Sequence, residues 1–293
     1  GGGGVGQVMG GALLDLRDEE AFDAGHVAGA TSIPLEELRW RMFELPPPYE
    51  EAVSLCGTRE HIAAAEEILG QYGWVIESTL DVDTHAWPPV LPLVQGTASR
   101  PIWKPSSFLQ EVLGMEEVRE WAASRALEGG KALGVDVGCG AGRDVCLLAR
   151  ELGPRWDVLG LDNHKGALER MAALAAREGV VVKADSTNLR KERGVELMGA
   201  LRADLIHGSR FMHRPLLALA QEGPLLKPGG LLVWSTFLQG SEQVRNGRSL
   251  ERGELREGCE RAGFRVLRDE EGTMVTSGKT VAAGFFAAFK NPA

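Results

Sequence analysis

The sequence lacks clustered cysteines. Its four cysteines, Cys56, Cys139, Cys146 and Cys259, form no CxxC pair and no combined His/Cys ligand pattern. Zinc sites and disulfide frameworks need such spacings. We therefore expect neither of them, and the sequence suggests no metal ligands.

A long apolar run and an excess of positive charge are also absent. No apolar run reaches the roughly 20 residues of a membrane-spanning helix, and no basic region followed by an apolar stretch opens the sequence. The net charge of −9 at pH 7 disfavours binding to nucleic acid. We expect a soluble intracellular protein that binds a small molecule and no membrane. It would lie in the cytoplasm, or in an organelle if a targeting segment was removed.

Changes in composition divide the 293 residues into segments. With 44% hydrophobic and 25% charged residues, the chain can bury the cores of two domains. Residues 1–11 are predicted to be a flexible leader, because glycine loses the most backbone freedom on folding. Residues 88–106 are rich in proline, which removes amide donors, and are predicted to be a linker. A small α/β domain is expected at 12–87 and a more regular one at 107–293.

A glycine-rich turn stands at the start of the second domain. The apolar run 132–137 ends in Gly-Cys-Gly-Ala-Gly, and a helix is predicted directly afterwards, over 143–152. Such a turn lets the backbone approach a ligand at the positive end of the helix. The spacing GxGxG differs from the GxGxxG of dinucleotide-binding turns, which disfavours a nicotinamide oxidoreductase. The candidate cofactor-binding residues here are Asp136, Gly138, Cys139 (through its backbone amide), Gly140, Gly142 and Arg143.

Acidic residues follow the next two predicted strands where these end. Asp162 comes about twenty residues after the glycine turn, where a carboxylate can accept both ribose hydroxyls. Asp185 follows the third apolar run and is placed to touch an adenine edge. Each aspartate can instead cap a helix or a turn, and the glycines can form a purely structural turn. The candidate residues at these two strand ends are Asp162, Asn163, Asp185 and Ser186.

Two further strands are predicted, at 204–209 and, after a Lys-Pro-Gly-Gly turn, at 231–237. Gly208 lies in the first of these and is a further candidate for the cofactor site. The ends of successive parallel strands meet at one edge of an open α/β sheet, and ligands bind there. All these candidates are therefore expected around one site.

Taken together, these segments resemble class I S-adenosylmethionine-dependent methyltransferases from about residue 130 to residue 290. Asp136-Val-Gly-Cys-Gly-Ala-Gly resembles the family's first motif, Asp162 its ribose-binding acid, and Asp185 with Ser186 its adenine-side motif. Lys227-Pro-Gly-Gly resembles the turn before the fifth strand. The resemblance implies a Rossmann-like α/β domain with a mostly parallel seven-stranded sheet, and S-adenosylmethionine as the cofactor.

A narrower resemblance concerns the methyl acceptor. Gly-Arg-Asp at 142–144, the stretch 211–217 and the region 235–242 are similar to tellurite-resistance-type methyltransferases, which implies a small sulfur, selenium or tellurium nucleophile. A sulfonium already carries a good leaving group, so the protein mainly has to align the reactants. His213 is a candidate base, because histidine titrates near neutral pH, although it can also be a packing residue. Arg210 and Arg214 can attract an anionic substrate or simply be solvated.

The first domain shows a second resemblance. Asp15-Leu-Arg17 and Gly-His-Val-Ala-Gly-Ala at 25–30 follow the rhodanese pattern, over about residues 12–87. Six positions starting at Cys56 would then form a loop over the N-terminus of a helix at 62–69, where amides stabilise a thiolate or persulfide. The resemblance implies that Cys56 takes sulfane sulfur from a donor. His61 stands where the family usually has arginine, and Cys56 can instead be a buried residue of an inert docking module.

The leading hypothesis is a fused protein. Its second domain would transfer methyl groups from S-adenosylmethionine to a small molecule such as a thiol or chalcogen compound, and its first domain would carry or sense sulfur. One alternative is a methyltransferase that acts on a macromolecule, although the sequence has no Asn/Asp-Pro-Pro-Tyr motif. Another is a binding protein that senses the cofactor or sulfur without catalysis.

Overall fold

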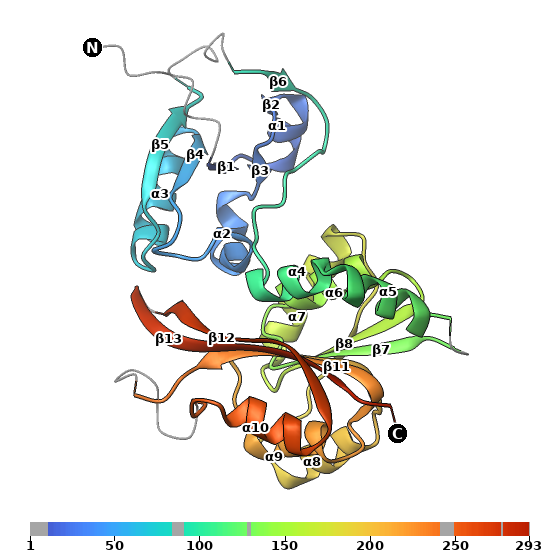
Figure 1. Ribbon diagram of the computed structural model, residues 1–293. Coiled ribbons are helices and arrows are strands. Elements are labelled where there is room, and N and C mark those ends of the chain that lie inside the picture. The colour runs from blue at the N-terminus through green and yellow to red at the C-terminus, as the bar shows by residue number, and fades with distance from the viewer. Residues whose placement is uncertain (1–10, 84–90, 128–129, 241–248, 277, 293) are drawn as a thin grey trace. The chain divides into compact units, whose positions relative to one another are not determined.

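The computed structural model describes most of the chain and divides it into two compact units, residues 1–104 and 105–293. The described residues are 11–83, 91–127, 130–240, 249–276, 278–292. Each unit has its own sheet (Figure 1). No described helix is long and apolar enough to cross a membrane. Apart from Gly11, the predicted flexible leader lies outside the described residues.

The first unit is built on a four-stranded parallel sheet with the order β3-β1-β4-β5. These strands are β1 (Ala12–Asp15), β3 (Thr31–Ser32), β4 (Val53–Gly57) and β5 (Ile76–Asp81). The helical segments between them are α1 (Glu19–Ala24), α2 (Leu35–Arg41), the short 3-10 helix η2 (Met42–Glu44) and α3 (Arg59–Gly70). In α3, buried Ile62, Ala65 and Leu69 recur at helical spacing and pack into the core of this sheet.

The segment expected to be a linker is largely part of the first unit. Residues 91–104 belong to it, and β6 (Leu93–Val94) pairs antiparallel with β2 (His26–Val27). Pro92 contributes through its carbonyl, which accepts a hydrogen bond from Ala28 N at 2.8 Å. Proline lacks only the amide donor, so a two-residue strand that uses neighbouring carbonyls tolerates it. Ile102 is buried in the core of the unit.

The second unit has a seven-stranded sheet with the order β12-β13-β11-β10-β7-β8-β9. Its strands are β7 (Ala132–Val137), β8 (Trp156–Leu161), β9 (Lys183–Asp185), β10 (Ala203–Ser209), β11 (Leu226–Phe237), β12 (Phe264–Thr276) and β13 (Lys279–Lys290). The expectation of a mostly parallel sheet needs correction, because the sheet is mixed. The five neighbouring strands β9, β8, β7, β10 and β11 pair in parallel. β12 and β13 form a long antiparallel hairpin, and β13 also pairs antiparallel with β11.

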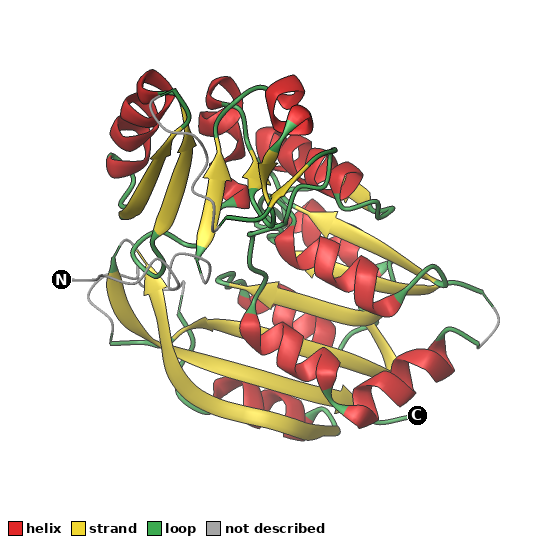
Figure 2. Ribbon diagram, turned by 90° about the horizontal axis from the view of Figure 1, so that it is seen from above, coloured by secondary structure: helices red, strands yellow, loops and turns green. Residues whose placement is uncertain are grey.

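Helices cover both faces of this second sheet (Figure 1, Figure 2). One face carries α4 (Ser107–Gly114), α5 (Glu116–Arg125), α6 (Arg143–Leu152) and α7 (Lys165–Arg177). The other carries α8 (Glu192–Gly199), α9 (Arg214–Gln221) and α10 (Glu254–Arg261). Each layer buries its own apolar core against the sheet. The arrangement is a doubly wound α/β fold, in which the ends of the parallel strands stay open to a ligand.

Strand register determines the neighbours of two predicted cofactor-binding residues, Asp136 and Asp185. Asp136 on β7 lies opposite His207 on β10, and Leu161 at the end of β8 lies opposite Asp185 at the end of β9. The third apolar run of the sequence, at 180–184, was predicted to be a strand, but β9 begins only at Lys183. The residues of β9 are exposed, so burial of apolar side chains does little to stabilise a longer strand.

Candidate functional site

The glycine loop joins the end of β7 to the start of α6. Gly138, Gly140 and Gly142 have positive φ angles of 72°, 54° and 81°. A Cβ on Gly142 would lie 2.1 Å from Cγ of Met171, and one on Gly138 would lie 2.6 Å from the ring of Phe211. Glycine is therefore required at both positions, because the backbone angle and the close neighbour each exclude a side chain. The Gly140 position, by contrast, has no neighbouring atom within 4 Å of such a Cβ.

Hydrogen bonds tie this loop to the ends of the next two strands. Gly140 N donates to Oδ2 of Asp162 at 3.0 Å, and Oδ1 of the same carboxylate accepts from His164 N at 2.9 Å. Asp162 N in turn donates to the carbonyl of Asp185 at 3.3 Å. The glycine turn and the two aspartates therefore stand at one edge of the sheet. The following helix is capped by His164, whose ring accepts from Ala167 N, and not by Asp162, so the helix-capping alternative for this aspartate is wrong.

An open pocket of about 190 Å³ lies at this edge. It is lined by Gly138, Leu161, Asp162, Asn163, Thr187, Asn188, Leu189, Arg190, Arg210 and Phe211. Of the predicted cofactor-binding residues, it includes Gly138, Asp162 and Asn163. Sequence reasoning missed the stretch 187–190, which directly follows the adenine-side motif. The polar Thr-Asn pair in an irregular segment was the signal that could have identified it.

The other predicted cofactor residues surround the pocket without lining it in the described structure. The exposed Asp185 accepts hydrogen bonds from Thr187 N at 2.8 Å and Oγ1 at 2.6 Å, so it orients a lining residue. Ser186 is exposed between them. Arg143 is the first residue of α6. Cys139 is part-buried, and burial raises the pKa of its thiol. Its amide donates to the carbonyl of Leu161 at 3.0 Å and its carbonyl accepts from Gly142 N at 3.0 Å, so the backbone group predicted to face the cofactor is bound within the protein.

Gly208 has a packing role. A Cβ there would lie 2.7 Å from the ring of Trp234, so the fully buried indole fits only over a glycine. Trp234 Nε1 donates to the carbonyl of Phe211 at 3.1 Å. Gly208 thus supports the pocket through Trp234 and Phe211.

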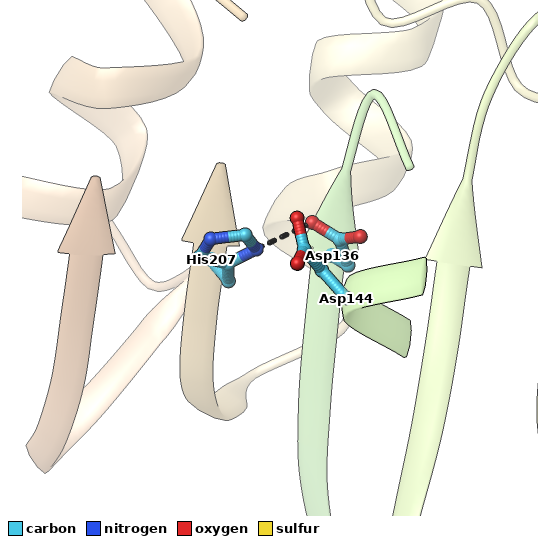
Figure 3. Close-up of side chains that lie close together, drawn as sticks. All are labelled: Asp136, Asp144 and His207. Carbon is cyan, nitrogen blue, oxygen red and sulfur yellow. Dashed lines mark hydrogen bonds and ion pairs between the residues drawn. The ribbon is translucent and has the colours of Figure 1, made fainter. Parts of the chain in front are cut away.

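Asp136, Asp144 and His207 form an acidic cluster below the loop, shown in Figure 3. His207 Nδ1 lies 2.7 Å from Oδ1 of the buried Asp136, and Asp144 Oδ1 accepts from Ser106 N at 2.7 Å. The potential ligand atoms of the three side chains lie within 4.8 Å of one another. Burial raises the pKa of Asp136. Burial opposes protonation of His207, but the Asp136 carboxylate outweighs it and raises the pKa of the imidazole. The two shifts favour the neutral form of Asp136 and the protonated form of His207.

His213 immediately precedes α9, two residues after the pocket-lining Phe211. Burial, and then the charge of Arg190, lower its pKa. Its Nδ1 is buried and has no hydrogen-bond partner among the described residues. A neutral imidazole with a free nitrogen can accept a proton near neutral pH.

Arg210 and Arg214, the two candidate anion-binding arginines, differ in their surroundings. Arg214 is bound to Glu254, with Nε–Oε1 at 2.6 Å and Nη2–Oε2 at 2.8 Å, so it is part of a structural ion pair. Arg210 lines the pocket. Arg190, which sequence reasoning missed, also lines it, and its guanidinium carbon lies 5.2 Å from the centre of the Phe211 ring.

The predicted active loop of the first unit is wrong. Cys56 lies inside β4 and is 0% exposed, and α3 begins at Arg59 rather than at Ile62. Thr58 caps that helix, because its side chain accepts from His61 N at 3.2 Å. Burial raises the pKa of Cys56 to about 12, and the charge of Asp15 adds to the rise. This environment disfavours the thiolate that sulfur transfer requires.

Comparison with known proteins agrees with the geometry of the second unit. Residues 135–232 match the family model of a methyltransferase domain. An uncharacterized protein of Schizosaccharomyces pombe is 26% identical, and the alignment covers 88% of each chain. This coverage exceeds the second unit and therefore extends into the first.

Solved structures also show similarity. TehB from Haemophilus influenzae is 14% identical, over 71% of this chain and 80% of that chain, with a TM-score of 0.46. An S-adenosylmethionine-dependent methyltransferase from Aquifex aeolicus is 18% identical, over 63% and 98%, with a TM-score of 0.40. TM-scores below 0.5 do not establish a shared fold, so the assignment rests on the family match and on the loop geometry.

The second unit therefore contains a class I methyltransferase domain with a Rossmann-like α/β fold. The cofactor of this domain is S-adenosylmethionine.

Proposed function

We propose that the second unit transfers a methyl group from S-adenosylmethionine to a small molecule with a soft nucleophile, such as a thiol or a selenium or tellurium compound. The observation that carries the proposal is the hydrogen bond from Gly140 N to Asp162 at the wall of the pocket. It joins the glycine loop to the acidic strand end, as a nucleoside cofactor requires.

The residues around the pocket fit this cofactor. S-adenosylmethionine carries a sulfonium, an ammonium and a carboxylate, and Asp144 of the acidic cluster suits its cationic amino-acid end. Asp162, which lines the pocket, would bind the ribose, and the lining residues Thr187 and Asn188 would contact the adenine. The open space beside Gly140 leaves the loop backbone accessible. When bound, the cofactor supplies an electrophilic methyl group.

The protein mainly has to align the nucleophile with the methyl group, because the sulfonium already carries a good leaving group and correct orientation gives most of the rate acceleration. Thr187 and Asp162 line one end of the pocket and would orient the cofactor there. The Phe211 ring packs against Gly138 and would exclude water from that part of the pocket. We assign the proton of the acceptor to His213, because it lies two residues after the pocket-lining Phe211 and its Nδ1 has no hydrogen-bond partner among the described residues.

Titration calorimetry of the full chain tests the cofactor site. S-adenosylmethionine should bind, and Asp162→Asn should weaken binding at least about tenfold, because hydrogen bonds to charged groups contribute about 1.5–3 kcal/mol. Asp157→Asn is the matched control: Asp157 lies on β8, the strand that Asp162 follows, but it is paired with Lys131 and Lys183. No binding at millimolar cofactor would refute the proposal.

Transfer of a labelled methyl group to thiols, selenite and tellurite then tests the reaction. Label in one of these small molecules supports the proposed acceptor class. Label found only in protein or nucleic acid would identify a macromolecular acceptor. Cofactor binding without any transfer would identify a sensor.

For the first unit we propose a rhodanese-like module that does not carry sulfur on Cys56. Arg17 holds the module together, donating to Asp15 at 2.9 and 2.6 Å and to the carbonyl of Gly25 at 2.8 Å. In the native protein Cys56 should resist alkylation at pH 8 and become reactive in urea, and Cys56→Ser should leave thiosulfate–cyanide sulfur transfer at background. Sulfur transfer by the wild type that this substitution removes would overturn the proposal.

A further inference from the structure

Two positively charged side chains stand at the wall of the cofactor pocket without acidic partners. Arg190 and Arg210 both line it, and neither forms an ion pair with a described carboxylate. Other arginines of this unit, such as Arg214 and Arg256, are bound to glutamate or aspartate. Arg202 has no ion pair with a described carboxylate either, so Arg190 and Arg210 differ from it in lining a pocket.

The cofactor alone does not account for these two positive charges. S-adenosylmethionine carries two positive charges and one negative charge, so its net charge is repelled by a guanidinium. Like charges repel more strongly where walls exclude water. An anion that binds beside the cofactor would remove this conflict, because guanidinium groups pair with carboxylates and oxyanions through two parallel hydrogen bonds.

Contacts place both arginines for such a ligand. Arg190 donates from Nη1 to the carbonyl of Met212 at 3.3 Å and lies over the Phe211 ring. Its other guanidinium donors have no hydrogen-bond partner among the described residues. Arg210 follows the end of β10, and its amide donates to the carbonyl of Ser235 at 2.8 Å. Both residues thus border Phe211, close to the proposed base His213.

Arg210 also has a strained backbone conformation. Its φ angle of 54° lies in the left-handed region, which glycine adopts far more easily than arginine. Such strained positions are concentrated at functional sites.

We infer that the methyl acceptor is an anionic small molecule, whose carboxylate or oxyanion group is bound by Arg190 and Arg210. The inference rests on the proposed methyl transfer and adds the charge of the acceptor to it. The anionic group would be held at the Phe211 side of the pocket, and the nucleophilic atom would face the cofactor. A simple mercapto acid has both groups, and selenite and tellurite combine them in one ion.

The test uses the full chain saturated with S-adenosylhomocysteine, so that binding is measured without turnover. Calorimetry compares mercaptopropionate with mercaptopropionamide, which have the same thiol but differ in charge. The carboxylate should bind at least about tenfold more tightly, which corresponds to about 1.4 kcal/mol. Arg190→Gln and Arg210→Gln, each saturated with S-adenosylhomocysteine at its own affinity, should each abolish most of this preference.

Two control variants separate charge from structure. Arg202 also has a positive φ angle, 49°, but lies before β10 and outside the pocket. Arg202→Gly and Arg210→Gly both relieve left-handed strain, yet only the second should reduce the preference for the carboxylate. Arg214→Gln removes an arginine that is already paired and should not change it.

The results distinguish failure of this inference from failure of the proposed function. Equal or undetectable binding of the two thiols to the loaded protein would overturn the inference. Arginine variants that weaken cofactor binding without changing the thiol preference would also overturn it, because the arginines would then bind the carboxylate of the cofactor itself. If the wild type fails to bind S-adenosylhomocysteine, the proposed function fails, and the inference fails with it.

Discussion

Gly142→Ala tests whether the glycine loop is shaped by its contact with Met171. Gly142 has a φ angle of 81°, and an added Cβ would lie 2.1 Å from Cγ and 2.7 Å from Cβ of Met171. Met171 is 0% exposed and lies in α7, so its side chain has little room to move. The alanine therefore introduces both backbone strain and overpacking.

The two effects can be estimated separately. A non-glycine residue in the left-handed region costs about 1–2 kcal/mol. Overpacking in a well-packed core adds about 1–3 kcal/mol. Gly140→Ala is the matched control, because Gly140 has a φ angle of 54° but no atom within 4 Å of the added Cβ. Gly142→Ala should therefore destabilise by about 1–3 kcal/mol more than Gly140→Ala.

Urea unfolding followed by circular dichroism measures this difference, provided that the slope with denaturant stays constant. Met171→Ala opens space at the clash and should couple favourably with Gly142→Ala in a double-mutant cycle. If Gly142→Ala costs no more than Gly140→Ala, and no coupling to Met171 is found, the proposed shape of the loop is incorrect.

Two further predictions concern pH. The pKa of His207 is raised above its unfolded value of about 6.5, so its contribution to stability is fully present below pH 6.5 and is lost as pH rises through the folded pKa. The stability difference between wild type and His207→Gln should shrink from pH 6 to pH 9 in urea unfolding, and a constant difference would contradict this assignment. Because the pKa of His213 is lowered by burial and by Arg190, kcat/KM should fall only below pH 6.5. Arg190→Gln should shift this acid limb upwards, measured with an acceptor that the variant still methylates, and His213→Gln should remove it.

The elements around the glycine loop could be predicted from sequence because their signals are local. β7 and α6 have the predicted bounds of 132–137 and 143–152. An apolar run, a glycine turn and an amphipathic helix each depend on near neighbours in the chain. The position of Asp162 after β8 follows in the same way.

The errors arose where distant contacts or a single cap decide the structure. Thr58 begins α3 three residues earlier than the apolar pattern indicated, and this removes the predicted loop at Cys56. Residues 88–106 were predicted to be a linker because their prolines break periodicity, but backbone groups of 91–104 bond to other parts of the first unit. The pocket residues 187–190 follow no period at all, so only the fold brings them to Asp162.

The hydrogen bond between Trp234 and Phe211 has a practical consequence. Phe211 lines the pocket, while Trp234 lies fully buried behind it, with its indole N–H bound to the Phe211 carbonyl. A ligand that displaces Phe211 would alter the surroundings of this indole and hence its fluorescence. The chain thus contains its own optical reporter of occupancy, and Trp234→Phe would identify that signal among its seven tryptophans.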